Sequence, residues 1–135
     1  MIKIIPVEHK MTFDAFKSDF FKGQEHYYRM EMQDGAQVLG VGDVFVKGEA
    51  AYLLALEILD QSMAAVIFDS LIRSLMNLAS HHGAVVFSAN EIYPLMSYFT
   101  KRDFSVIDKF TRFEDAEAFT YYVNIESFFA RPCKG

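Results

Sequence analysis

The chain has 135 residues, of which 52% are hydrophobic and 16% aromatic, and its formal net charge is -5. This length predicts one domain over residues 1–135, and this composition predicts a folded globule and excludes a disordered chain. The acidic balance offers no electrostatic attraction to nucleic acid or to an anionic membrane surface, so we expect neither as a partner.

The N-terminal part of the chain predicts a strand followed by a helix. Ile2 to Val7 is apolar, and Pro6 within it restricts such a strand to the edge of a sheet. Thr12 is a candidate helix N-cap, and a row of Phe residues after it falls on one helical face. The Phe row indicates core packing.

Two further strands form a predicted hairpin. They run from Glu25 to Met32 and from Gln37 to Val46, and the Asp34-Gly35 pair between them is a strong turn signal. Gly40 and Gly42 lie inside the second strand, where glycine indicates a bulge or the close approach of another backbone.

The central part of the chain has the pattern strand, helix, strand, helix. Ala50 to Leu59 is almost entirely apolar, which is typical of a strand covered on both faces. Helical spacing follows from Ala64 to His81, and then a strand from Ala84 to Ala89 and a helix opened by Pro94. A crossover helix predicts that the two strands are parallel, with a crevice at their carboxyl ends where small ligands bind.

The C-terminal part predicts two more strands, from Phe104 to Phe113 and from Phe119 to Ile125. Cys133 is the only cysteine, so no internal disulfide can form and a cytoplasmic location is expected. The high content of Phe and Met residues is compatible with a homodimer interface. No metal-ligand spacing is present, because His81 and His82 are adjacent and do not share a helical face.

The order of these elements, together with the segment Tyr98 to Phe104 (YFTKRDF), resembles the GNAT superfamily of acyl-CoA N-acyltransferases. The resemblance covers most of the chain. It implies a mixed α/β fold in which antiparallel strands lead into a splayed parallel strand pair with flanking helices. It also implies acetyl-CoA as the cosubstrate and a small-molecule or protein amine as the acceptor.

The family binds the pyrophosphate of CoA in a glycine-containing loop between the first parallel strand and the helix after it. The matching segment here, Gln61 to Phe68, contains no glycine. Free N–H groups at a helix N-terminus need no particular side chain to hold a phosphate, so the segment remains the candidate site. The resemblance assigns the cofactor contacts to Ile58, Leu59, Gln61, Met63, Ala64, Ala65, Val66, Ile67, Phe68 and Asn90. An ordinary helix start, with Asn90 as an N-cap, is the alternative.

The resemblance also suggests two catalytic side chains. Glu57 is the charge inside the first parallel strand, where family members carry a general base, and burial would raise its pKa toward a useful range. Tyr98 lies one residue before the position of the family's general acid, which is Phe99 here, and Tyr93 is a second candidate. A structural role is the alternative for each of these residues.

Three functions stay open on the sequence. The first is an acetyl-CoA-dependent N-acetyltransferase. The second is a GNAT-like domain that has lost acetyl transfer and serves as a binding or interaction module, as the missing glycines and Phe99 would suggest. The third, an unrelated small α/β ligand-binding domain, requires that the two central strands are antiparallel or are not splayed apart.

Overall fold

The computed structural model describes residues 1–8, 24–89, 105–106 and 121–130. The predicted helices after Thr12 and after Pro94, most of the strand from Phe104 to Phe113, and Cys133 lie outside the described residues.

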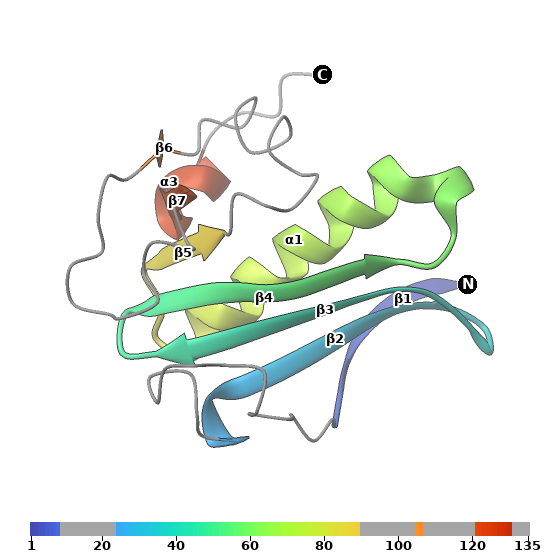
Figure 1. Ribbon diagram of the computed structural model, residues 1–135, viewed down its shortest axis with the longest axis horizontal. Coiled ribbons are helices and arrows are strands. Elements are labelled where there is room, and N and C mark those ends of the chain that lie inside the picture. Colours follow the sequence, from blue (N-terminus) through green and yellow to red (C-terminus); the bar gives the residue numbers. More distant parts are fainter. Residues whose placement is uncertain (9–23, 90–104, 107–120, 131–135) are drawn as a thin grey trace.

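Within the described residues one sheet of seven strands forms, in the order β1-β2-β3-β4-β5-β7-β6 (Figure 1). Its strands are β1 (Ile2–Val7), β2 (Tyr27–Asp34), β3 (Gln37–Lys47), β4 (Ala50–Ile58), β5 (Val86–Ala89), β6 (Ser105–Val106) and β7 (Tyr121–Asn124). The pair β4 and β5 is parallel, and the other neighbouring strands are antiparallel. The prediction of antiparallel strands that lead into a parallel pair is confirmed. Because β4 and β5 are parallel, the antiparallel arrangement that would indicate an unrelated α/β domain is excluded.

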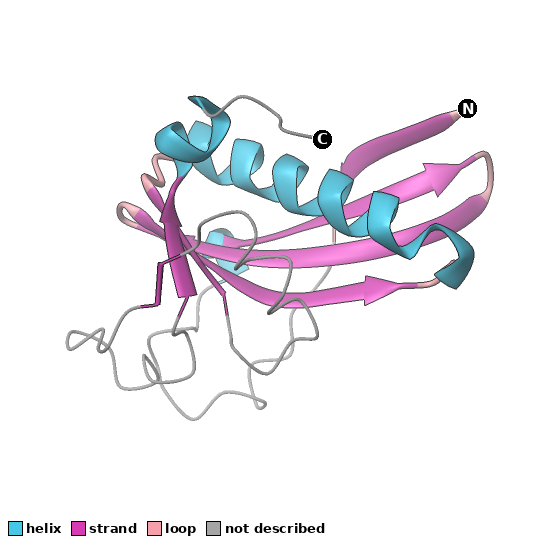
Figure 2. Ribbon diagram, turned by 90° about the horizontal axis from the view of Figure 1, so that it is seen from above, coloured by secondary structure: helices cyan, strands magenta, loops and turns pink. Residues whose placement is uncertain are grey.

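The helices of the described residues lie on one face of this sheet, as Figure 2 shows: α1 (Ala64–His81) along the strands, and the short α3 (Ile125–Ala130) beside it. Two 3-10 turns, η3 (Gln24–His26) and η4 (Gln61–Met63), precede β2 and α1. The predicted bounds of α1 are confirmed. Gly83 ends it at a φ of 97°, where the N–H of Ala84 donates to the carbonyl oxygen of Ala79 over 3.0 Å. Glycine favours this left-handed conformation because it has no Cβ.

Helix α1 is long and apolar enough, together with η4, to cross a membrane by length and composition alone. In this structure its apolar side chains pack on the sheet. Six of them are buried in the structure: Ile67, Leu71, Ile72, Leu75, Met76 and Ala79. They alternate at helical spacing with the exposed or half-buried residues, so one side of α1 packs on the sheet.

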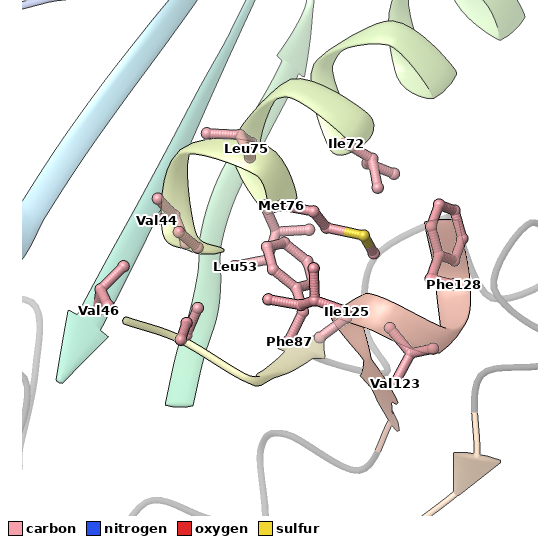
Figure 3. Close-up of a cluster of buried hydrophobic side chains, with 14 of the residues drawn as sticks. Val44, Val46, Leu53, Ile72, Leu75, Met76, Phe87, Val123, Ile125 and Phe128 are labelled. Carbon is pink, nitrogen blue, oxygen red and sulfur yellow. The ribbon is translucent and has the colours of Figure 1, made fainter. Parts of the chain in front are cut away.

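The main core lies between α1, α3 and the sheet. Figure 3 shows side chains of α1 that converge with those of β3, β4, β5, β7 and α3. Leu53, Leu75, Met76 and Phe87 are fully buried there, and Phe128 of α3 closes one side of the cluster. Burial of apolar side chains of this size supplies the main free energy of folding.

Most of the predicted strand boundaries differ from the structure by one or two residues. Glu25 belongs to η3, so the first hairpin strand begins at Tyr27. The second parallel strand begins at Val86 rather than Ala84. Ile125 is the first residue of α3 and not the last of a strand, because the side chain of Asn124 accepts a hydrogen bond from the N–H of Ser127 over 2.9 Å and caps the helix.

Gly40 and Gly42 allow α1 to approach β3 closely. A Cβ at Gly40 would lie 2.5 Å from Cγ2 of Ile67, and one at Gly42 would lie 2.6 Å from Cδ1 of Leu75. A close approach is therefore present as predicted, but the nearest groups are side chains of α1 rather than another backbone. A bulge is also present, and the residue that the pairing of β2 with β3 skips is Leu39, next to Gly40.

Candidate functional site

The described pairing between β4 and β5 ends before β4 does. Pairing of β4 with β5 runs from Ala50 and Val86 to Leu53 and Ala89, while β4 itself continues to Ile58. At the same level the pairing of β3 with β4 skips Leu54, which makes a bulge in β4. The last described pair of β4 and β5 thus lies beside an irregular backbone segment, and β4 continues beyond it.

The chain enters α1 directly from this part of β4. The N–H groups of Leu59 and Asp60 both donate to the carbonyl oxygen of Leu39, over 2.9 and 3.2 Å. Oδ1 of Asp60 accepts from the N–H of Ser62 over 3.1 Å and from its hydroxyl over 2.6 Å. The side chain of Gln61 donates to the carbonyl oxygen of Ile58 over 3.2 Å. The loop therefore holds its own conformation without a ligand, and one of its N–H groups is capped by a carboxylate.

The N-terminus of α1 is accessible to a ligand. The side chains of Gln61, Ala65 and Val66 are exposed, whereas Ile67 is fully buried against β3. Ile67 can therefore contact a ligand only through its backbone. The sequence has no Lys or Arg between Lys47 and Arg73, so this stretch of the chain offers an anion the dipole of α1 and no cationic side chain, and Asp60 opposes the dipole.

No protein-family model matches the chain, and the comparison with curated proteins also gives no match. Solved structures do match. An acetyltransferase of the GNAT family from Staphylococcus aureus superposes with a TM-score of 0.63 at 10% identity, over 91% of this chain and 99% of its own. The ribosomal-protein-S18-alanine N-acetyltransferase of Escherichia coli gives 0.60 at 10% identity, over 90% of this chain and 91% of its own.

This protein has the GNAT fold. A third neighbour, the PaiA N-acetyltransferase of Thermoplasma acidophilum, was solved in complex with coenzyme A. It superposes with a TM-score of 0.58 at 14% identity, over 73% of this chain and 61% of its own. The likeness rests on the path of the backbone, because so few residues are identical.

Only some of the predicted site residues lie in the described part of the structure. Glu57 lies in β4 opposite Val41, on the face away from α1, and its side chain is exposed. The expectation that this carboxyl group is buried is therefore wrong. Its neighbours Leu56 and Ile58 are half-buried and pack on the side of α1. Tyr98, Tyr93 and Asn90 lie outside the described residues.

Sequence analysis missed an ion pair on the face of the sheet opposite α1. Nε and Nη2 of Arg29 donate to Oδ1 and Oδ2 of Asp43 over 2.6 and 2.8 Å. Arg29 and Asp43 are opposite each other in β2 and β3, and Asp43 also pairs with Ala55, beside the bulge. The period-2 alternation of β2 places Arg29 and Tyr27 on one face, and this signal could have identified the pair.

The ion pair and Tyr27 form one polar cluster. Burial, followed by the charge of the Asp43 carboxylate, raises the pKa of Tyr27 well above its ordinary value. The hydrogen bonds from Arg29 to Asp43 raise the pKa of the guanidinium further. Tyr27 stays protonated and Arg29 stays charged near neutral pH, so the cluster has a fixed charge state.

A second residue that the sequence analysis missed is Ser88 of β5. It is fully buried, and its Oγ has no hydrogen-bond partner within the part of the chain that the structure describes. Tyr52 of β4 is in register with it and is also fully buried. A serine inside the apolar segment Val85 to Ala89 was the available signal. Among the described residues, no group of three or more His, Cys, Asp or Glu side chains is placed to hold a metal ion.

Proposed function

We propose that this protein is an acyl-CoA-dependent N-acyltransferase that transfers an acetyl group from acetyl-CoA to an amine. The observation that supports this most is the parallel pair of β4 and β5 within the GNAT fold, in which β4 continues past the bulge at Leu54 and is followed by the exposed N-terminus of α1. The coenzyme A complex of the PaiA N-acetyltransferase, a neighbour of the same fold, supports the choice of donor.

In this proposal the donor lies along the second half of β4. The edge of a strand offers backbone donors and acceptors to an extended ligand, here the pantetheine arm. Ile58 and Leu59 would border the arm, and Asn90 would follow β5 on the other side. The phosphates would lie at the start of α1, near the exposed Gln61, Ala65 and Val66. The remaining proposed contacts are Met63, Ala64, Ile67 and Phe68.

The proposed reaction is a direct transfer. The amine nitrogen attacks the thioester carbon, the C–N bond forms, and the C–S bond breaks. We propose that Glu57 accepts the proton that the amine loses, directly or through water, because its exposed carboxylate lies on β4 beyond the bulge. Tyr98 is the proposed donor of the proton that the departing thiolate of CoA receives.

The first experiment measures the binding of CoA and acetyl-CoA by calorimetry, and then the loss of acetyl-CoA in the presence of a polyamine, an amino-acid amide and a peptide with a free N-terminus. Glu57→Gln and Tyr98→Phe should each lower kcat/KM by about a hundredfold, the lower end of general acid-base contributions. Glu31→Gln is a matched control, because Glu31 is in β2 and pairs with the same residue, Val41. Equal rates in both variants and the wild type would overturn the two assignments.

The alternative function is a binding module that has lost acetyl transfer. The self-capped loop favours it, since the Asp60 carboxylate occupies the N–H of Ser62 and would repel a phosphate. Binding of CoA without turnover of any amine would support this alternative. Absence of CoA binding at millimolar concentration would contradict acetyl transfer itself.

A further inference from the structure

The carbonyl oxygen of Leu39 accepts two hydrogen bonds from the connection between β4 and α1. The N–H groups of Leu59 and Asp60 donate to it over 2.9 and 3.2 Å, where the chain leaves β4. Figure 1 shows the start of β3 and this connection at the same end of the sheet. Regular pairing of two strands gives each carbonyl oxygen one N–H of the facing strand. Leu39 therefore holds the start of the connection in addition to the end of β4.

Leu39 is also the bulge residue of β3. The pairing of β3 with β2 includes Val38 and Gly40 and skips Leu39 between them. The extra residue of a bulge is left out of the ladder and bends its own strand locally. Its side chain is 2% exposed and lies in one cluster with Ile67 and Leu71 of α1. Leu39 thus packs with α1 through its side chain and holds the connection through its backbone.

The connection that Leu39 holds leads to the part of α1 where the proposed function places the phosphates of the donor. The side chains of Gln61, Ala65 and Val66 are exposed there. A ligand that has to order a loop loses part of its binding free energy, whereas a loop that the fold already orders spares it this cost. Two hydrogen bonds that order the connection in the ligand-free protein should therefore strengthen the binding of the donor.

We propose that Leu39 is a positioning residue for the donor, because its carbonyl oxygen fixes Leu59 and Asp60 and so orders the start of α1 before acyl-CoA binds. This inference rests on the proposed acyltransferase function and adds to it a residue that touches no ligand. The bulge then serves donor binding rather than the hairpin of β2 and β3. A strand without the extra residue would keep the pairs of Val38 and Gly40 with β2.

The test is a variant in which Leu39 is deleted, so that the bulge is removed. The dissociation constant of CoA, measured by calorimetry, should rise about tenfold, the effect of one or two hydrogen bonds. Amide hydrogen exchange at Leu59 and Asp60 should become faster in the ligand-free variant. Met32→Ala is the matched control, because Met32 is a buried side chain of the same cluster and the bulge stays. It should unfold about 10 °C below the wild type and bind CoA within about twofold of it.

Other outcomes decide against the inference. Unchanged CoA affinity or unchanged hydrogen exchange in the deletion variant, or an equal loss of affinity in Met32→Ala, would overturn the role of Leu39 and leave the proposed function intact. A wild type that binds no CoA at millimolar concentration would overturn both proposals.

A second variant decides the question if the deletion variant does not fold. A backbone ester in place of the N–H of Leu59 removes one of the two hydrogen bonds and changes no side chain. The dissociation constant of CoA should then rise about threefold, which corresponds to about half of the effect of the deletion in free energy. An unchanged dissociation constant would overturn the inference.

Discussion

The two faces of the sheet are built from the same strands and differ in chemistry. On the face toward α1, glycine and aliphatic residues let the helix approach β3 so closely that a Cβ at Gly42 would lie 2.6 Å from Leu75. On the other face, alternate residues of β2 and β3 provide the buried ion pair of Arg29 and Asp43. Close apolar packing stabilises the first face, and the second face contains charged side chains in an ion pair.

The difference indicates what each face contributes to the proposed site. Close packing of α1 fixes where the helix begins relative to the end of β4, which is where the proposed donor lies. The polar face carries Glu57, the described residue that we propose to accept a proton from the amine. The following predictions test the two faces separately, beginning with the largest effect.

Leu75→Ala should destabilise the protein most. Leu75 is fully buried and packs on Gly42, so its removal leaves a cavity under α1. We expect a loss of about 3.5 kcal/mol in the free energy of unfolding, measured by urea denaturation. Val66→Ala, an exposed position in the first turns of α1, should change it by no more than about 0.5 kcal/mol. Similar losses in both variants would mean that α1 is not packed on the sheet as described.

Asp43→Ala should be the most damaging change on the polar face. The variant leaves the Arg29 guanidinium, whose side chain is 22% exposed, without its carboxylate partner. Removing one member of a buried pair costs about 3 kcal/mol. Replacing both residues by leucine should recover much of this loss, because no buried charge then remains. A loss below about 1 kcal/mol for Asp43→Ala would show that the pair behaves as a solvent-exposed one.

The sequence predicted the apolar face more completely than the polar one. Helical spacing from Ala64 to His81 predicted α1 correctly, because apolar periodicity has a direct structural consequence, whereas the glycines at 40 and 42 predicted a bulge or a close approach without identifying α1 as the partner. Glu57 illustrates the limit. Its position inside an apolar strand suggested burial, yet β4 continues past its pairing with β5, and the side chain is exposed there.

The partners of Arg29 and of Ser88 are set by the register between neighbouring strands. A single sequence does not determine that register. Arg29 and Asp43 are 14 residues apart along the chain, and they meet because the bulge at Leu39 shifts the pairing of β3. A shift by one residue would have moved Asp43 to the face of α1. The charge partners could therefore be found only after the strands were aligned.

Gly42→Ala should have an intermediate effect and should be coupled to Leu75. The new Cβ would force the Leu75 side chain to move, at a cost of about 1.5 kcal/mol in the free energy of unfolding. In the double variant with Leu75→Ala, the added methyl group occupies space that the leucine has left, so the combined loss should be smaller than the sum by at least about 0.5 kcal/mol. The Leu71 side chain lies against Gly40 rather than Gly42. The losses of unfolding free energy in Leu71→Ala and Gly42→Ala should therefore be additive.

Tyr27→Phe should change the pH dependence of stability on the polar face. Burial and the Asp43 carboxylate raise the pKa of Tyr27 in the folded protein, whereas in the unfolded chain it titrates near its ordinary value of about 10. Below that pH both states hold the proton, so the full stability is present. Above it the unfolded chain loses the proton and the folded protein keeps it, so deprotonation favours unfolding.

The wild type should therefore lose stability as the pH rises above about 10, by up to about 1.4 kcal/mol per pH unit from this residue, and Tyr27→Phe should lack that component. Urea denaturation at pH 8, 10 and 11 measures both slopes. Other tyrosines contribute to both proteins alike, so the difference between the slopes isolates Tyr27. Parallel slopes would mean that the phenol is not held protonated beside Asp43, and the fixed charge state of the polar face would then have to be abandoned.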